Sequence, residues 1–120
     1  MGLYNFQKRF VPLILDGRKT HTIRALRGYP DKPGNTMHLY TGLRQKGAKV
    51  LMRVQCVRVE TILITASGGV RIEGVYLSPD EREALARRDG FETYAEMLTF
   101  WREPKNRLPF RGQIFHWKKP

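Results

Sequence analysis

The chain contains little cysteine and no long apolar run. Cys56 is the only cysteine among 120 residues, so intrachain disulfides and metal sites built from several thiolates are excluded. A lone thiol is typical of a protein in the reducing cytoplasm, and its apolar neighbours predict that Cys56 is a small core residue. No apolar stretch approaches the ~20 residues that a membrane-spanning helix needs, so we expect no membrane partner. The three histidines lack metal-ligand spacing, and we expect neither a metal nor another cofactor.

Acidic residues are also scarce. The chain has 11 Asp and Glu residues and 22 Lys and Arg residues, which gives a formal net charge of +11. Such an excess favours a polyanionic partner, and nucleic acid is the first candidate. The length, the 41% hydrophobic content and the absence of repeats and linkers predict one soluble domain over residues 1–120. Nothing in the sequence indicates an obligate protein partner.

Helix-capping patterns predict two helices in the second half of the chain. The first follows the run Ser78-Pro79-Asp80-Glu81, which supplies a cap, a first-turn proline and a capping-box glutamate, and it ends near Gly90. A second capping box at residues 93–96 opens the other helix, which ends before Pro104. We expect a shorter helix over residues 12–17, with the apolar side chains of its middle buried.

Elsewhere the pattern predicts β-structure. A phase shift near residues 56–57 indicates a bulge in a long strand. The expected strands are 36–41, 49–59, 61–64, 70–73 and 113–117. Short strands with a few helices in so small a domain indicate an α+β fold, a curled sheet or small β-barrel of about five or six strands with two or three flanking short helices.

The run from Asp16 to Arg24 combines cations and hydroxyls in a pattern that supports catalysis. A lysine and a threonine form a base and a nucleophile when the lysine loses its proton, and neighbouring arginines lower the pKa of Lys19. In a strand over residues 20–24, Thr20, Thr22 and Arg24 would share one face. Lys19 meets Thr22 only if it lies in the turn before that strand. A solvated basic loop is the alternative interpretation.

A second cluster lies around Tyr40. The tyrosine is followed by a glycine turn and by Arg44 and Lys46, which suits base stacking by Tyr40 and phosphate contacts by the two cations. Arg18 is a further candidate for nucleic-acid contact. The alternative is a hairpin with a charged tip. His116 is more simply a structural histidine than a general acid or base.

Asp89 stands where the first predicted helix ends. A carboxylate there faces the negative end of the helix dipole, which is mildly unfavourable. Either the acid acts elsewhere, or it pairs on the surface with Arg87 or Arg88.

With these residues described, the chain resembles the ASCH-domain family of the PUA-like superfamily. The resemblance is carried mainly by Gly17-Arg18-Lys19-Thr20-His21-Thr22-Ile23-Arg24. The supporting segments are residues 6–10, 33–35, 39–42, 89–91 and 109–112. The resemblance implies a small β-barrel with flanking helices and a cleft that binds RNA or a nucleoside.

Bacterial members of that family include small amidohydrolases that remove the acyl group from N4-acetylcytidine with a lysine, a threonine and a glutamate. The resemblance assigns the first two roles to Lys19 and Thr22, and the acid falls on Asp89, one methylene shorter than the family residue. Glu92 and Glu96 are nearby substitutes for it.

The expected function is therefore removal of the N4-acyl group from acylated cytidine, as a nucleoside or in RNA. Arg24 and Thr20 are the candidates for binding substrate or the oxyanion. Two alternatives remain: a non-catalytic module that binds RNA or single-stranded nucleic acid, and a ribonuclease with Lys46, Tyr40 or His116 near a 2′-hydroxyl.

Overall fold

One long strand organises the fold. In the computed structural model, which describes residues 2–42, 46–103 and 106–118, strand β4 (Lys49–Ile64) spans 16 residues. Its first half pairs with β3 (Thr36–Thr41) and its second half with β7 (Phe110–Trp117), both antiparallel. The register with β7 shifts between Cys56 and Arg58. The predicted bulge is therefore confirmed, whereas the two strands predicted over 49–59 and 61–64 are one continuous strand that bends.

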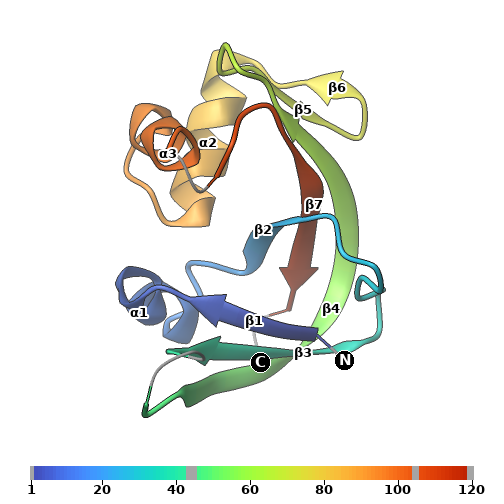
Figure 1. Ribbon diagram of the computed structural model, residues 1–120, viewed down its shortest axis with the longest axis vertical. Helices are drawn as coiled ribbons and strands as arrows, with labels where there is room; N and C mark the ends of the chain where they lie inside the picture. Colours follow the sequence, from blue (N-terminus) through green and yellow to red (C-terminus); the bar gives the residue numbers. More distant parts are fainter. Residues whose placement is uncertain (1, 43–45, 104–105, 119–120) are drawn as a thin grey trace.

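The other strands extend this sheet on both sides. Strand β1 (Gly2–Phe6) lies parallel to β3, and β2 (His21–Ala25) pairs with β7. Strands β5 (Val70–Ile72) and β6 (Val75–Tyr76) follow beyond the end of β4. The result is a curled, open sheet of seven strands (Figure 1), one more than the upper expectation. The fold is α+β, as predicted.

Short helices complete the structure. A 3-10 turn, η1 (Lys8–Phe10), leads into α1 (Val11–Leu15), and two longer helices follow β6: α2 (Pro79–Asp89) and α3 (Tyr94–Trp101). The capping box at the start of α2 is complete, and Gly90 ends that helix with φ 104°. At α3 only half of the predicted box forms. The Thr93 hydroxyl accepts from the Glu96 N–H, but the Glu96 carboxylate accepts from the N–H of Glu92.

The apolar side chains of these elements form a contiguous buried cluster. Helices α2 and α3 lie on the side of the curl that is opposite β4, while α1 lies beside β1 (Figure 1). Cys56 is fully buried, as predicted. Among the residues that the structure describes, no helix combines the length and the apolar character that crossing a membrane requires.

Arginine side chains close a seam between β1 and β2. Within the described strands, β1 pairs with β3 and β2 with β7. Arg24 donates from Nη2 to the Asn5 carbonyl oxygen at 2.8 Å, and Arg27 donates to that of Leu3 at 3.3 Å. The open edge of β1 thus receives side-chain donors in place of a neighbouring strand.

Candidate active site

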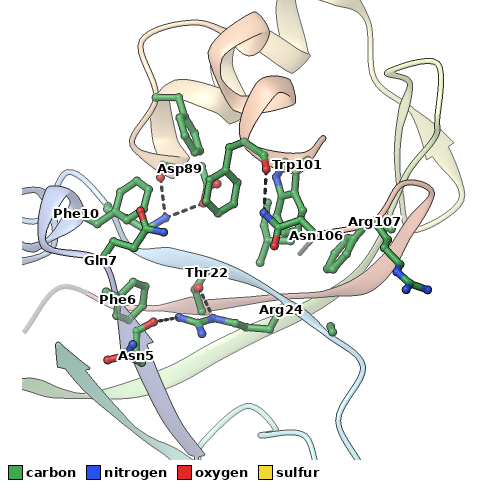
Figure 2. A pocket seen from close by; sticks show the side chains of 16 residues that line it. Asn5, Phe6, Gln7, Phe10, Thr22, Arg24, Asp89, Trp101, Asn106 and Arg107 are labelled. Atoms are coloured by element: carbon green, nitrogen blue, oxygen red, sulfur yellow. Dashed lines mark hydrogen bonds and ion pairs between the residues drawn. The ribbon is translucent and has the colours of Figure 1, made fainter. Parts of the chain in front are cut away.

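A cleft of about 580 Å³ opens at this seam. Its polar floor consists of Lys19, Thr22, Arg24 and Asp89 (Figure 2). The aromatic side chains of the lining, here called the aromatic wall, are Phe6, Phe10, Phe91, Phe100, Trp101 and Phe110, and the ring of Phe10 lies 5.0 Å from Lys19 Nζ. A cleft in which polar groups converge beside apolar side chains is a common type of small-molecule site.

Lys19 lies in the turn that precedes β2, the position that a pairing with Thr22 would require, and both residues line the cleft. Among the described residues, however, the hydrogen bonds of Lys19 Nζ go to Asp89 and not to Thr22. Gly17 has a positive φ of 84°, and the Lys19 N–H then donates to the Leu13 carbonyl oxygen at 3.0 Å. The side chain is buried, with 3% of the residue exposed. Its Nζ donates to two oxygens of Asp89, the backbone carbonyl oxygen and Oδ1, at 2.7 Å each. The solvated basic loop is therefore wrong for Lys19.

Asp89 is buried rather than paired on the surface. It is 6% exposed, because the last turn of α2 faces β2 and the turn before it. Its Oδ1 contacts Lys19 and also lies 3.1 Å from Nε2 of His21, in a geometry that falls short of a hydrogen bond. The surface pair with Arg87 or Arg88 is wrong, and the acid is part of a buried cluster.

Burial and charge perturb all three groups of this cluster. Burial lowers the pKa of Lys19, and the Asp89 carboxylate opposes this only in part, while Arg24 adds to it. Burial also lowers the pKa of His21, against the opposing effect of Asp89. Burial alone would raise the pKa of Asp89, but Lys19 and His21 together hold it below its ordinary value. The cluster therefore combines an ionised carboxylate with an amine that loses its proton more easily than a surface lysine.

Thr22 and Arg24 form the second half of the floor. Arg24 Nε donates to Thr22 Oγ1 at 2.9 Å, so the two side chains share one face of β2, as alternation predicts. The guanidinium lies over the ring of Phe6, 4.9 Å from its centroid. Burial, with a smaller contribution from Arg27, lowers the pKa of Arg24 to about 10. Because Thr22 Oγ1 accepts this bond, its own hydrogen is available to a base.

The other predicted site residues lie outside the cleft lining. Thr20 is half-buried, and its carbonyl oxygen accepts from the Trp117 N–H at 2.9 Å. Arg18 is exposed and forms an ion pair with Asp16 at 2.7 Å. Tyr40 is half-buried on β3. Lys46 lines a separate groove of about 660 Å³, and Arg44 lies outside the described residues.

The structure also supplies residues that the sequence did not indicate. Asn106 lies on the cleft wall, where Nδ2 donates to the Phe100 carbonyl oxygen at 2.8 Å. In Figure 2 the amide oxygen lies on the side of Thr22 and Arg24, where it can accept a hydrogen bond. Asn106 belongs to no motif, so no local signal marks it. His21 was recognisable only as a histidine inside the motif, because strand alternation assigns it to the face opposite Thr22.

No protein-family model, curated protein or solved structure matches this chain. The ASCH resemblance therefore stays a prediction.

Proposed function

We propose that this protein is an amidohydrolase that removes the N4-acyl group from acylated cytidine, as a nucleoside or within RNA. The observation that carries the proposal is the buried Lys19, bonded to Asp89 at the floor of a cleft that also contains the Thr22 hydroxyl. A buried amine with a lowered pKa is suited to act as a general base near neutral pH. The Thr22 hydroxyl lines the same cleft, and a hydroxyl that such a base reaches becomes an activated nucleophile.

The cleft has the size and composition for an acylated nucleobase. Its volume of about 580 Å³ falls within the range of roughly 300–1,000 Å³ that is usual for small-molecule sites. Its aromatic wall offers faces on which a flat pyrimidine stacks, an interaction worth about 1–3 kcal/mol per base. The oriented amide oxygen of Asn106 is a suitable acceptor for the N–H of the N4-acyl amide.

The proposed reaction proceeds through attack on the acyl carbon. Lys19 accepts the hydroxyl proton of Thr22, and Oγ1 forms a bond to the carbonyl carbon. The bond from that carbon to N4 then breaks, and Lys19 returns its proton to N4, which releases cytidine. Water hydrolyses the resulting threonine ester to the free acid. In the second route, Lys19 activates water directly; both routes convert amide and water into amine and acid.

Arg24 and Asp89 support these steps in different ways. Arg24, which already donates to Thr22 Oγ1, carries further N–H groups that suit a developing oxyanion, and such a donor is typically worth about 3 kcal/mol. Asp89 holds the Lys19 amine in place. Its lowered pKa argues against a protonated Asp89 that donates to the cytosine ring.

Incubation with N4-acetylcytidine, with chromatographic detection of cytidine, tests the proposal. We expect turnover by the parent protein and loss of at least about 100-fold in Lys19→Met, since this change removes the base of both routes. Thr22→Val should lose as much if the threonine is the nucleophile and much less if Lys19 activates water. Thr22→Ser keeps the hydroxyl and is the matched control. Absence of turnover by parent protein with native circular dichroism would contradict the proposal.

Non-catalytic RNA binding is the second candidate, and one observation favours it. The groove beside Lys46 is also lined by Lys8 and Lys49, with no acidic residue among its described lining residues. Together with the net charge of +11, this suits a phosphate backbone. RNA binding by a protein without turnover would support this alternative.

A further inference from the structure

Arg24 is a cation of the cleft floor whose own acceptors carry no charge. Its Nε donates to the Thr22 hydroxyl oxygen at 2.9 Å, and its Nη2 donates to the Asn5 carbonyl oxygen at 2.8 Å. A guanidinium has more N–H groups than these bonds use, and those of Nη1 bond to none of the described residues. The side chain is half-buried and lines the cleft. A ligand in the cleft therefore meets free donors on Arg24.

The charges that line the cleft do not balance. The described lining residues include three cations, Lys19, Arg24 and Arg107, but a single carboxylate, that of Asp89. This carboxylate is already paired with Lys19 Nζ at 2.7 Å. Arg27 adds positive charge near Arg24, and burial together with this charge lowers the pKa of Arg24 to about 10. A partly buried cation that no described carboxylate pairs with favours an anionic ligand.

The guanidinium of Arg24 is held in one orientation. Its carbon lies 4.9 Å from the ring centroid of Phe6 and 5.5 Å from that of Tyr4. Together with the bonds to β1 and β2, these contacts fix its plane, so a ligand pays little for ordering the side chain. A planar guanidinium matches the two oxygens of a carboxylate, and such charge-assisted pairs are stronger than neutral hydrogen bonds.

The proposed reaction generates a carboxylate beside this cation. Thr22 Oγ1, which accepts from Arg24 Nε, is the atom that attacks the acyl carbon in the first route. Hydrolysis leaves that carbon with two oxygens, and the O–H proton of the acid passes to water, because carboxylic acids are ionised near neutral pH. Cytidine is uncharged under the same conditions. The acid is therefore the product that Arg24 attracts.

We propose that Arg24 is a carboxylate-binding site that holds the acid product, and that small planar carboxylates such as acetate compete there with the acyl group of the next substrate. The N–H groups of Nη1 donate to the carboxylate, and the bonds to Thr22 and Asn5 persist. The inference rests on the proposed function for the origin of the acid. The binding itself involves no covalent step and needs no turnover.

NMR titration of the parent protein with sodium acetate tests the binding without reference to activity. Sodium acetate replaces sodium chloride at constant ionic strength, because salt screens exposed charges. We expect the Nε–H resonance of Arg24, assigned through its backbone, to shift with saturation. The resonance of Arg18, which is exposed and paired with Asp16, should change little. A shift that grows linearly with acetate, or equal shifts of both arginines, would overturn the proposal.

Inorganic phosphate, titrated in the same way, separates a carboxylate site from a site for phosphate. We expect acetate to reach half-saturation at the lower concentration, since a more highly charged anion loses more hydration on entering a half-buried site. Half-saturation by phosphate at an equal or lower concentration would assign the site to phosphate and overturn the carboxylate assignment.

Product inhibition provides the functional reading. We expect acetate to inhibit turnover of N4-acetylcytidine competitively, and Arg24→Lys to raise the inhibition constant of acetate at least about 10-fold, since lysine keeps the charge but loses the planar fork. The inhibition constant of cytidine should change much less. Arg27→Lys is the matched control, because Arg27 is not among the described residues that line the cleft. An equal rise for acetate in both variants would contradict a site at Arg24.

The two proposals fail in different ways. A protein that binds acetate at Arg24 but shows no turnover retains the carboxylate site and loses the amidohydrolase function. A protein that turns over N4-acetylcytidine, with no saturable shift of Arg24 in acetate, retains the function and loses the carboxylate site.

Discussion

At the residue scale, the buried cluster makes the folded state sensitive to acid. The pKa of His21 is lowered from 6.5 and that of Asp89 from 3.8, so the unfolded chain binds more protons than the native protein at acidic pH. Stability is then present above these ordinary values and is lost as the pH falls through them. Each extra proton bound by the unfolded chain contributes a slope of about 1.4 kcal/mol per pH unit.

We therefore expect the free energy of unfolding to fall between pH 7.5 and pH 4.5, measured by urea denaturation. His116 also has a lowered pKa and contributes to the same slope. His21→Leu removes one of these two imidazoles, so its slope between pH 6.5 and pH 5 should be shallower than that of the parent. Equal slopes in the two proteins would show that His21 is not held neutral by burial.

Arg24 permits a second prediction at this scale, because its guanidinium serves two acceptors at once. Nε reaches Thr22 Oγ1 and Nη2 reaches the Asn5 carbonyl oxygen. Lysine keeps the charge but cannot reproduce this fork. We expect Arg24→Lys to lower kcat for N4-acetylcytidine by about 10-fold or more and the unfolding free energy by about 1 kcal/mol.

Arg27→Lys is the matched control for this change. Arg27 donates to the same strand edge, at the Leu3 carbonyl oxygen, and does not line the cleft. Arg27→Lys should lower the unfolding free energy by a similar or smaller amount and leave kcat unchanged. An equal loss of kcat in both variants would mean that Arg24 acts only by closing the seam.

At the scale of elements, the end of α2 couples helix termination to the site. Gly90 has φ 104°, and a Cβ added there would lie 2.8 Å from Cδ1 of Phe10. Gly34 has a similar φ of 97°, but a Cβ added at that position would have nothing within 4 Å. The two glycines separate the conformational cost of an alanine from its steric cost.

We expect Gly34→Ala to lower the unfolding free energy by about 1–2 kcal/mol, since only the left-handed backbone opposes it. Gly90→Ala should cost about 1–3 kcal/mol more, because Phe10 or the helix end must move. Since Asp89 precedes Gly90, turnover should fall only in the second variant. Urea denaturation measures the two unfolding free energies, and the cytidine assay measures turnover. Equal losses of unfolding free energy in the two variants would contradict the steric argument.

Local signals explain which elements the sequence predicted. The caps at Ser78 and Gly90 and the alternation in β4 act within a few residues, so the helix ends and the bulge were recognisable. Strand β1 was missed, because its five residues are stabilised by long-range pairing with β3. The same holds for the site. Lys19 and Thr22 lie in one motif, whereas the contact of Asp89 with His21 depends on how α2 packs against β2.

At the scale of the whole molecule, the net charge of +11 exceeds what a nucleoside hydrolase requires. The cations are not equivalent, however. Arg18 is neutralised by Asp16, whereas Lys46 lines a groove with two other lysines and no acidic residue among its described lining residues. Counterion release depends on cations that reach phosphates, so the groove rather than the total charge should determine how affinity responds to salt.

Titration of a fluorescent single-stranded RNA at several salt concentrations measures this response. We expect log K to fall steeply with log salt, and Lys46→Ala to reduce the slope by about 0.7–1, the contribution of one phosphate contact. Arg18→Ala removes another exposed cation that is already paired, so its slope should match that of the parent. A smaller salt slope for Lys46→Ala than for Arg18→Ala would place the RNA strand along the groove. Equal reductions in both variants would instead mean that RNA responds only to the overall field of the protein.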